Sequence, residues 1–229
     1  MVQFTRYAIY YTPPKGALAT FGAHWLGWDI EAGQHVAHPD IPDLPCPVEN
    51  ITRTPRKYGL HGTIKPPFHL AQGTSVTELQ DACAVLAAKL PAITLPSLQL
   101  SRLGGFLAVT IAGEQTPLAE LASTVVRDLD PFRAPASDRE IKRRQQANLS
   151  PRQTALLQKW GYPYVMDEFR FHITLTGPQS EHDASRVHAA LAPILVPILP
   201  SPFQVSDLTL VGEGPDGMFH EIHRYALSG

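Results

Sequence analysis

Residues 58–68 read YGLHGTIKPPF and residues 169–176 read FRFHITLT, and these two segments decide the fold. Each contains a histidine, a threonine two positions later and then an aliphatic residue: His61-Gly-Thr63-Ile and His172-Ile-Thr174-Leu. Of the ten histidines, only these two have Thr or Ser two positions on. Aromatic and β-branched residues predict a strand over 58–68 and another over 169–176. Because strand side chains alternate between faces, the His and Thr of each motif are expected on the same face.

The residues that follow each segment repeat the same order of elements. Capping boxes that begin at Ser75 and Ser180 predict a helix after each strand. Two further strands around a glycine-rich turn follow each helix, at Gly104-Gly105 and at residues 212–217. Strand, helix, strand, strand therefore occurs twice, which indicates a duplication.

The repeat predicts an α+β fold. We expect a duplicated, two-lobed domain over residues 1–229, with two antiparallel sheets facing a central cleft and helices on the outside. The first repeat is expected over about 58–112 and the second over about 169–227, with a helical insert over about 116–160. A strand at 7–11 and a short helix at 17–26 precede them.

The paired motifs bring together groups suited to acid–base chemistry. Two lobes related by approximate two-fold symmetry would place two imidazoles and two hydroxyls around one small volume. Since histidine has a pKa of about 6.5, one imidazole can act as general base while the other acts as general acid. Threonine hydroxyls can stabilise anionic oxygens. A cyclic phosphodiester fits this arrangement, and no metal or other cofactor is required.

The motifs and several longer strings resemble the 2H phosphoesterases, named for two H-x-[ST]-aliphatic motifs. The likeness is greatest to a bacterial branch encoded beside carbon–phosphorus lyase genes of phosphonate degradation. The strings that carry it are Arg6–Tyr11, Phe21-Gly22, Trp25–Gly27, Tyr58–Phe68, Phe132–Pro135, Trp160–Tyr164 and Phe171–Gly177.

The resemblance implies a metal-independent cyclic phosphodiesterase. It implies 5-phosphoribosyl 1,2-cyclic phosphate as the substrate, with His61, Thr63, His172 and Thr174 as the catalytic residues. Two alternatives stay open: an RNA 2′,3′-cyclic phosphodiesterase, and a non-catalytic protein that binds a phosphosugar or interacts with a partner. The sequence does not say which histidine is base and which acid.

Strand parity suggests further substrate-binding residues. Lys65 shares the parity of His61 and Thr63, and is expected to point into the cleft toward a second phosphate. Thr176 shares the parity of the second motif. Tyr10 and Tyr11 lie on opposite faces of their strand, and one of them, assigned here as Tyr10, is expected to reach the substrate.

Two other regions offer candidates outside the motif strands. Tyr164, in the rigid Gly161–Tyr164 loop before the second motif, is expected to wall the pocket. The stretch from Arg133 to Arg152 holds six basic residues, and Arg133 and Arg143 are the candidates there for binding a distal phosphate. A solvated helix face is the common alternative for such a run.

Composition limits the class of protein. The chain has 19 Lys and Arg against 21 Asp and Glu, a net charge of −2, which argues against a broad nucleic-acid surface. Two cysteines are too few for a disulfide framework, and no apolar run suits a membrane helix. His220 and His223 lie three apart on a predicted strand and so face opposite ways, which argues against a metal site. We therefore expect a cytoplasmic protein with a small phosphorylated sugar as its partner, and the oligomeric state is left open.

Overall fold

The computed structural model describes residues 3–137, 140–142 and 148–229. Its centre is a seven-stranded sheet in the order β11-β10-β1-β4-β8-β7-β6, with each neighbouring pair antiparallel. The strands are β1 (Tyr7–Tyr11), β4 (Gly62–Phe68), β6 (Leu98–Leu103), β7 (Phe106–Ile111), β8 (His172–Thr174), β10 (Asp207–Glu213) and β11 (Phe219–Ala226). Two-stranded pairs are formed by β2 (Trp28–Asp29) with β3 (Gln34–His35), and by β5 (Ile93–Leu95) with β9 (Phe203–Val205).

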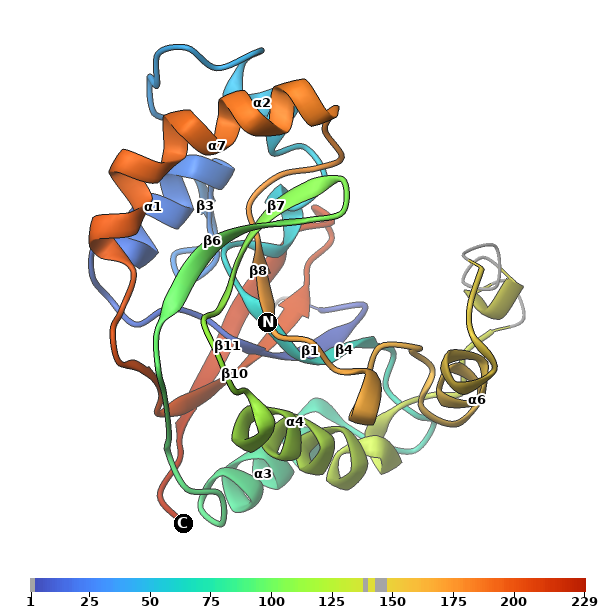
Figure 1. The fold of residues 1–229 in the computed structure, drawn as a ribbon. Coiled ribbons are helices and arrows are strands. Elements are labelled where there is room, and N and C mark those ends of the chain that lie inside the picture. The colour runs from blue at the N-terminus through green and yellow to red at the C-terminus, as the bar shows by residue number, and fades with distance from the viewer. Residues whose placement is uncertain (1–2, 138–139, 143–147) are drawn as a thin grey trace.

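Helices cover the two ends of this sheet (Figure 1). α3 (Val76–Ala87) and α4 (Thr116–Asp128) lie at one end, whereas α1 (Ala17–Leu26), α2 (Val48–Ile51) and α7 (Glu181–Leu195) lie at the other. α6 (Pro151–Trp160) projects to one side. Single turns of 3-10 helix occur at Arg56–Tyr58, Asp130–Phe132, Met166–Glu168 and Val196–Ile198. The α+β class is confirmed.

The two repeats are interleaved. Strand, helix, short strand and hairpin follow one another in β4-α3-β5-β6-β7 and again in β8-α7-β9-β10-β11. However, α3 of the first copy packs on β10 and β11 of the second, while α7 packs on β6 and β7 of the first. β5 and β9 also pair across the copies. Each lobe therefore combines segments from both copies.

The two predicted sheets are joined edge to edge instead of facing one another as separate layers. β4 and β8 meet at the single residue pair Gly62–Ile173, which connects the two halves. Gly62 has no side chain, and the ring of Phe171 occupies the space where a Cβ would lie. The close approach of β4 and β8 depends on long-range packing, which cannot be predicted from strand patterns in the sequence.

The predicted helix boundaries agree well with the structure. Ser75 and Ser150 each accept a bond from the backbone three residues on, in full capping boxes, and Ser180 caps α7 in the same way. Gly161 ends α6 in a left-handed conformation with φ 72°, as its position after Trp160 predicts. The helical insert expected over about 116–160 lies partly outside the described residues, and within it Ser137 and Glu140 form reciprocal capping bonds.

The two motif strands are shorter than predicted. β4 begins at Gly62 because residues 56–58 form a 3-10 turn and Gly59 takes φ 67°. β8 spans only His172–Thr174, since a 3-10 turn precedes it and its pairing with β7 ends at Thr174. His61 therefore lies just before its strand, and Thr176 lies beyond the end of the other.

Candidate functional site

Both motifs line one pocket of about 410 Å³ beside the β4–β8 junction. His61 and Thr63 come from the first copy, and His172 and Thr174 come from the second. The described residues that complete the lining are Arg6, Tyr10, Thr54, Pro55, Tyr58, Pro66, Pro67 and Tyr162. The four motif residues are thus brought together as the duplication predicted, and no Asp or Glu is among the described lining residues.

The two imidazoles are anchored in the same way. The Nδ1 of His61 lies 2.9 Å from the carbonyl oxygen of Gly59, and the Nδ1 of His172 lies 2.8 Å from that of Arg170. Because a carbonyl oxygen can only accept, Nδ1 carries the proton and donates it in each case. In the neutral form of either ring, Nε2 is then the nitrogen with the lone pair, which is the atom a general base needs.

Thr63 is within hydrogen-bonding distance of that nitrogen. Its Oγ1 lies 3.1 Å from the Nε2 of His61, so the hydroxyl donates to the ring. The pKa of His61 is lowered to about 4, chiefly by burial and to a smaller extent by nearby His172, while the bond to the Gly59 carbonyl opposes the shift. His61 is therefore neutral at physiological pH in the unliganded protein.

Tyr10 lies directly beneath the first histidine. Its ring stacks on that of His61, with centroids 3.9 Å apart and planes 27° apart. The side chain is fully buried, and its hydroxyl has no hydrogen-bond partner among the residues that the structure describes. Burial raises the pKa of this phenol well above its usual value, with Tyr58 adding to the rise and Arg6 opposing it. Tyr10 thus lines the pocket, as assigned from the sequence, and lies near Arg6.

Lys65 does not point into the pocket, so the prediction from strand parity is wrong. Tyr10 pairs with Thr63, but Ile9 pairs with Lys65, so a β-bulge at Ile64 inserts one residue. The bulge moves Lys65 to the face of Ile9, where it is 1% exposed. Its Nζ donates to the carbonyl of Val126 at 2.9 Å and lies 3.6 Å from the Asp130 carboxylate.

Thr176 is structural in this fold, contrary to the prediction. Beyond β8 the backbone amides of Leu175 and Thr176 both bond to the carbonyl of Leu107, so strand alternation stops there. The buried Thr176 hydroxyl accepts from the Leu107 amide at 3.0 Å and donates to the Gly177 carbonyl at 2.8 Å. It does not line the pocket.

The loop before the second motif contributes a different tyrosine from the one predicted. Tyr162 lines the pocket, whereas Tyr164 is 46% exposed and lies outside the lining. The two rings meet edge to face, with centroids 5.7 Å apart. Because Pro163 separates them in an irregular loop, no strand or helix period indicates which one faces inward.

None of the described residues of the basic stretch lines the pocket. Arg133 lies outside the pocket lining, and its guanidinium donates to Asp130 at 2.7 and 3.2 Å and to the Lys159 carbonyl at 3.1 Å. It therefore ties the end of α4 to the end of α6. Arg143 lies outside the described residues.

Arg6 is the pocket residue that the sequence interpretation missed. It stands one position before β1 and lines the pocket together with Tyr58. Its shared parity with Tyr10 was a usable signal, since residues four apart on a strand face the same way. Tyr58, Thr54 and Pro55 come from an irregular segment that offers no periodic signal.

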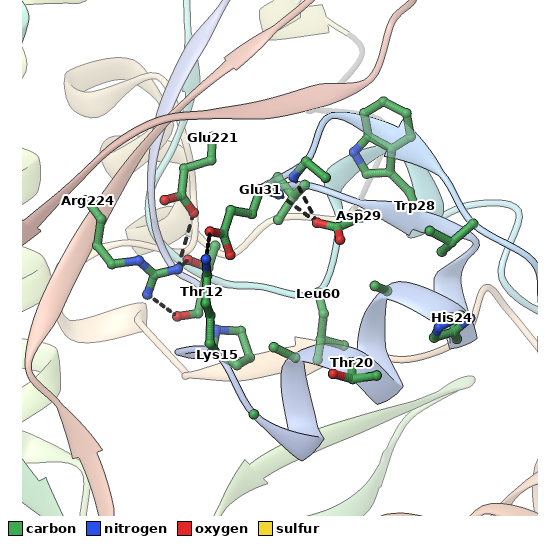
Figure 2. A pocket seen from close by; sticks show the side chains of 17 residues that line it. Thr12, Lys15, Thr20, His24, Trp28, Asp29, Glu31, Leu60, Glu221 and Arg224 are labelled. Carbon is green, nitrogen blue, oxygen red and sulfur yellow. Dashed lines mark hydrogen bonds and ion pairs between the residues drawn. The ribbon is translucent and has the colours of Figure 1, made fainter.

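A second pocket, of about 520 Å³, lies between α1 and the β2–β3 hairpin (Figure 2). Its cations are already matched by carboxylates: Lys15 lies 2.9 Å from Glu31, and Arg224 lies 3.2 Å from Glu221. Arg224 also donates to the Thr12 hydroxyl at 2.7 Å. No paired His and Thr motif lines it, so its chemistry differs from that of the first pocket.

No group of three or more His, Cys, Asp or Glu in the described part of the chain could hold a metal ion. Likewise, none of the helices in the described ranges is both long and apolar enough to span a membrane.

Comparison with known proteins gives a family match and several relatives. Residues 63–220 match the family described as "Protein of unknown function (DUF1045)". Proteins named ribose 1,5-bisphosphate phosphokinase PhnN are similar: that of Janthinobacterium sp. (strain Marseille) is 34% identical over 98% of this chain and 51% of its own length. That of Laribacter hongkongensis (strain HLHK9) is 34% identical over 78% of this chain and 41% of its own length. The chain thus spans about half the length of the curated relatives it matches.

Solved structures also resemble the chain over nearly its whole length. LigT of E. coli in complex with 3′-AMP is 17% identical with a TM-score of 0.45, covering 99% of this chain and 100% of that one. A structure described as a phosphoesterase is 18% identical with a TM-score of 0.44, covering 98% and 99%.

Proposed function

The chain belongs to the DUF1045 family, and we propose that it is a cyclic phosphodiesterase of the 2H type that uses no metal. One observation carries the proposal. Two histidines with the same backbone anchor, each followed by a threonine, line a single pocket that has no carboxylate among its described residues. Such a pocket suits an anionic substrate that needs both a base and an acid.

In the proposed reaction His61 is the general base. Its neutral Nε2 accepts a proton from water, whose oxygen attacks phosphorus. The pKa of His61 near 4 makes the free imidazole a weak base, but a bound phosphate anion favours the protonated form and so raises the pKa toward the working pH. His61 therefore gains basicity when substrate is bound.

His172 is the general acid in this scheme. It donates a proton to the alkoxide oxygen as the bond between that oxygen and phosphorus breaks. When substrate is bound, the Thr63 hydroxyl turns from the His61 Nε2 to a non-bridging oxygen, which leaves that nitrogen free to accept from water. Thr174 donates to another non-bridging oxygen, where negative charge grows. One water is consumed, and the cyclic diester opens to a phosphate monoester and an alcohol.

We propose a phosphorylated ribose as the substrate, namely 5-phosphoribosyl 1,2-cyclic phosphate. The resemblance to the phosphonate-associated branch suggests it. The relative from Janthinobacterium supports it, since its name, ribose 1,5-bisphosphate phosphokinase, places that protein on a phosphorylated ribose. A pocket of about 410 Å³ suits a small molecule of this kind better than a polymer.

A substrate panel followed by phosphorus NMR tests the proposal. The panel contains 5-phosphoribosyl 1,2-cyclic phosphate, nucleoside 2′,3′-cyclic phosphates and short RNA with a cyclic end. We expect turnover of the first compound, with His61→Ala and His172→Ala each slower by about 100-fold or more. His188→Gln, on the exposed face of α7, is the control and should keep the wild-type rate.

Other outcomes of the panel would overturn parts of the proposal. Preferred turnover of nucleoside or RNA cyclic phosphates would favour the RNA phosphodiesterase. Binding of the ribosyl compound without turnover of any substrate would favour a phosphosugar-binding protein. Wild-type activity in either histidine variant would refute the paired mechanism.

A further inference from the structure

Arg6 is the fixed positive charge in the described lining of the pocket. It precedes β1, where its carbonyl accepts from the Glu213 amide at 2.8 Å, so its backbone is held in the sheet. It stands four positions before Tyr10, which pairs with Thr63. At a strand rise of about 3.3 Å per residue, the two Cα positions lie about 13 Å apart. The backbone of Arg6 thus lies away from the pair Tyr10–Thr63, although Arg6 lines the same pocket.

The ion pair with Glu213 occupies only one edge of the Arg6 guanidinium. Nε and Nη2 of Arg6 donate to the two oxygens of Glu213 at 2.5 and 2.6 Å, so both bonds use the same edge and Nη1 lies on the other. The Lys57 ammonium also lies 3.7 Å from Glu213. Two cations therefore share one carboxylate, and this group keeps a net charge of +1.

Arg6 lies among the aromatic rings beside the pocket. Its guanidinium carbon is 5.7 Å from the centroid of the Phe219 ring, and that ring lies 5.3 Å from the ring of Tyr58 and 5.9 Å from that of Tyr10. The Tyr10 hydroxyl is the buried side-chain group without a hydrogen-bond partner in the described part of the chain. An unsatisfied buried hydroxyl is costly, and it is expected to find a partner in a working state of the site.

The histidine pocket and the pocket of Figure 2 differ in the charges of their lining residues. The pocket of Figure 2 contains Lys15 and Arg224 but also three carboxylates, those of Asp29, Glu31 and Glu221. The histidine pocket combines Arg6 with two imidazoles and has no carboxylate in its described lining. Only the charges of the histidine pocket favour a ligand with more than one negative group.

We propose that Arg6, assisted by the Tyr10 hydroxyl, binds a second anionic group of the substrate, apart from the phosphodiester held between the two histidines. The ligand class is a small molecule with a cyclic phosphodiester at one end and a phosphate or carboxylate at the other. This assignment rests on the proposed function. Because Arg6 holds the second anion and not the phosphodiester, it sets specificity and takes no proton in the reaction.

The test compares two substrates that differ only in the second anion. They are ribose 1,2-cyclic phosphate with a 5-phosphate and the same compound with a free 5-hydroxyl. For Arg6→Gln we expect kcat/KM to fall by about 10- to 100-fold on the first and by less than about 3-fold on the second. Lys15→Gln, which removes a cation from the other pocket, should leave both values at the wild-type level.

Two further variants keep the test decisive. Arg6→Gln/Glu213→Gln removes both partners of the ion pair, so it excludes a loss caused by an unpaired Glu213. Tyr10→Phe should also reduce the ratio of kcat/KM for the phosphorylated substrate to kcat/KM for the unphosphorylated one. The thermal unfolding midpoint of this variant should rise, because an unpaired buried hydroxyl is removed. Equal losses on the two substrates, or an unchanged preference, would overturn the assignment.

Failure of the proposed function gives a different result. If the wild-type protein hydrolyses neither compound, calorimetric titration with the same two compounds still tests the subsite. Tighter binding of the phosphorylated one that disappears in Arg6→Gln would support it. Equal binding of the two compounds by the wild-type protein would contradict it.

Discussion

The depressed pKa of His61 makes the stability of the protein depend on pH in a specific interval. An unfolded histidine titrates at about 6.5, whereas His61 in the fold titrates at about 4. Between these values the unfolded chain binds a proton that the folded chain does not, so the free energy of unfolding falls as pH is lowered. The full difference corresponds to about 3 kcal/mol. Because the ring is only half-buried, we expect about 1 to 2 kcal/mol.

Urea unfolding at pH 7.5 and at pH 4 measures this dependence. Between pH 7.5 and pH 4 the free energy of unfolding should fall by about 1 to 2 kcal/mol less in His61→Gln than in the wild type. His188→Gln makes the same chemical change on the exposed face of α7 and should keep the wild-type dependence. An NMR titration that places the His61 ring above pH 6, or equal pH dependence in His61→Gln and wild type, would refute the reasoning. Adding a phosphate-containing ligand should raise the ring's pKa.

Three further predictions follow from the placement of other side chains. Lys65→Met should keep KM within about 2-fold, because Lys65 lies on the core face, and a large rise in KM on the proposed substrate would contradict the β-bulge assignment. Thr176→Val should reduce the free energy of unfolding by about 1 to 3 kcal/mol in urea, since the Leu107 amide loses its acceptor, while KM stays unchanged. EDTA should leave the rate of hydrolysis unaltered, because the proposed steps use imidazoles and hydroxyls; loss of activity restored by added zinc would count against them.

The sequence predicted the local features of this fold and missed those that depend on long-range register. Capping residues such as Ser75 and Ser180 act within one turn of their helices, so they are readable from the chain. The side to which Lys65 points depends on a bulge against β1, and the end of β8 depends on β7. Arg6 lies outside any predicted strand, and its place in the pocket follows from the pairing of β1 with β4 and β10. Substrate-binding residues were therefore harder to predict than the motif residues.

The motif residues were predictable because each imidazole is oriented by its own segment. The carbonyls that hold His61 and His172 belong to Gly59 and Arg170, two residues upstream in each case. The fold has only to bring two pre-oriented segments together, and it does so at Gly62 and Ile173. A methyl group at Gly62 would overlap the Phe171 ring, so the glycine inside the first motif is required by the packing of the second. The residue between His61 and Thr63 thus fixes the distance between the two halves of the site, while its neighbours supply the chemistry.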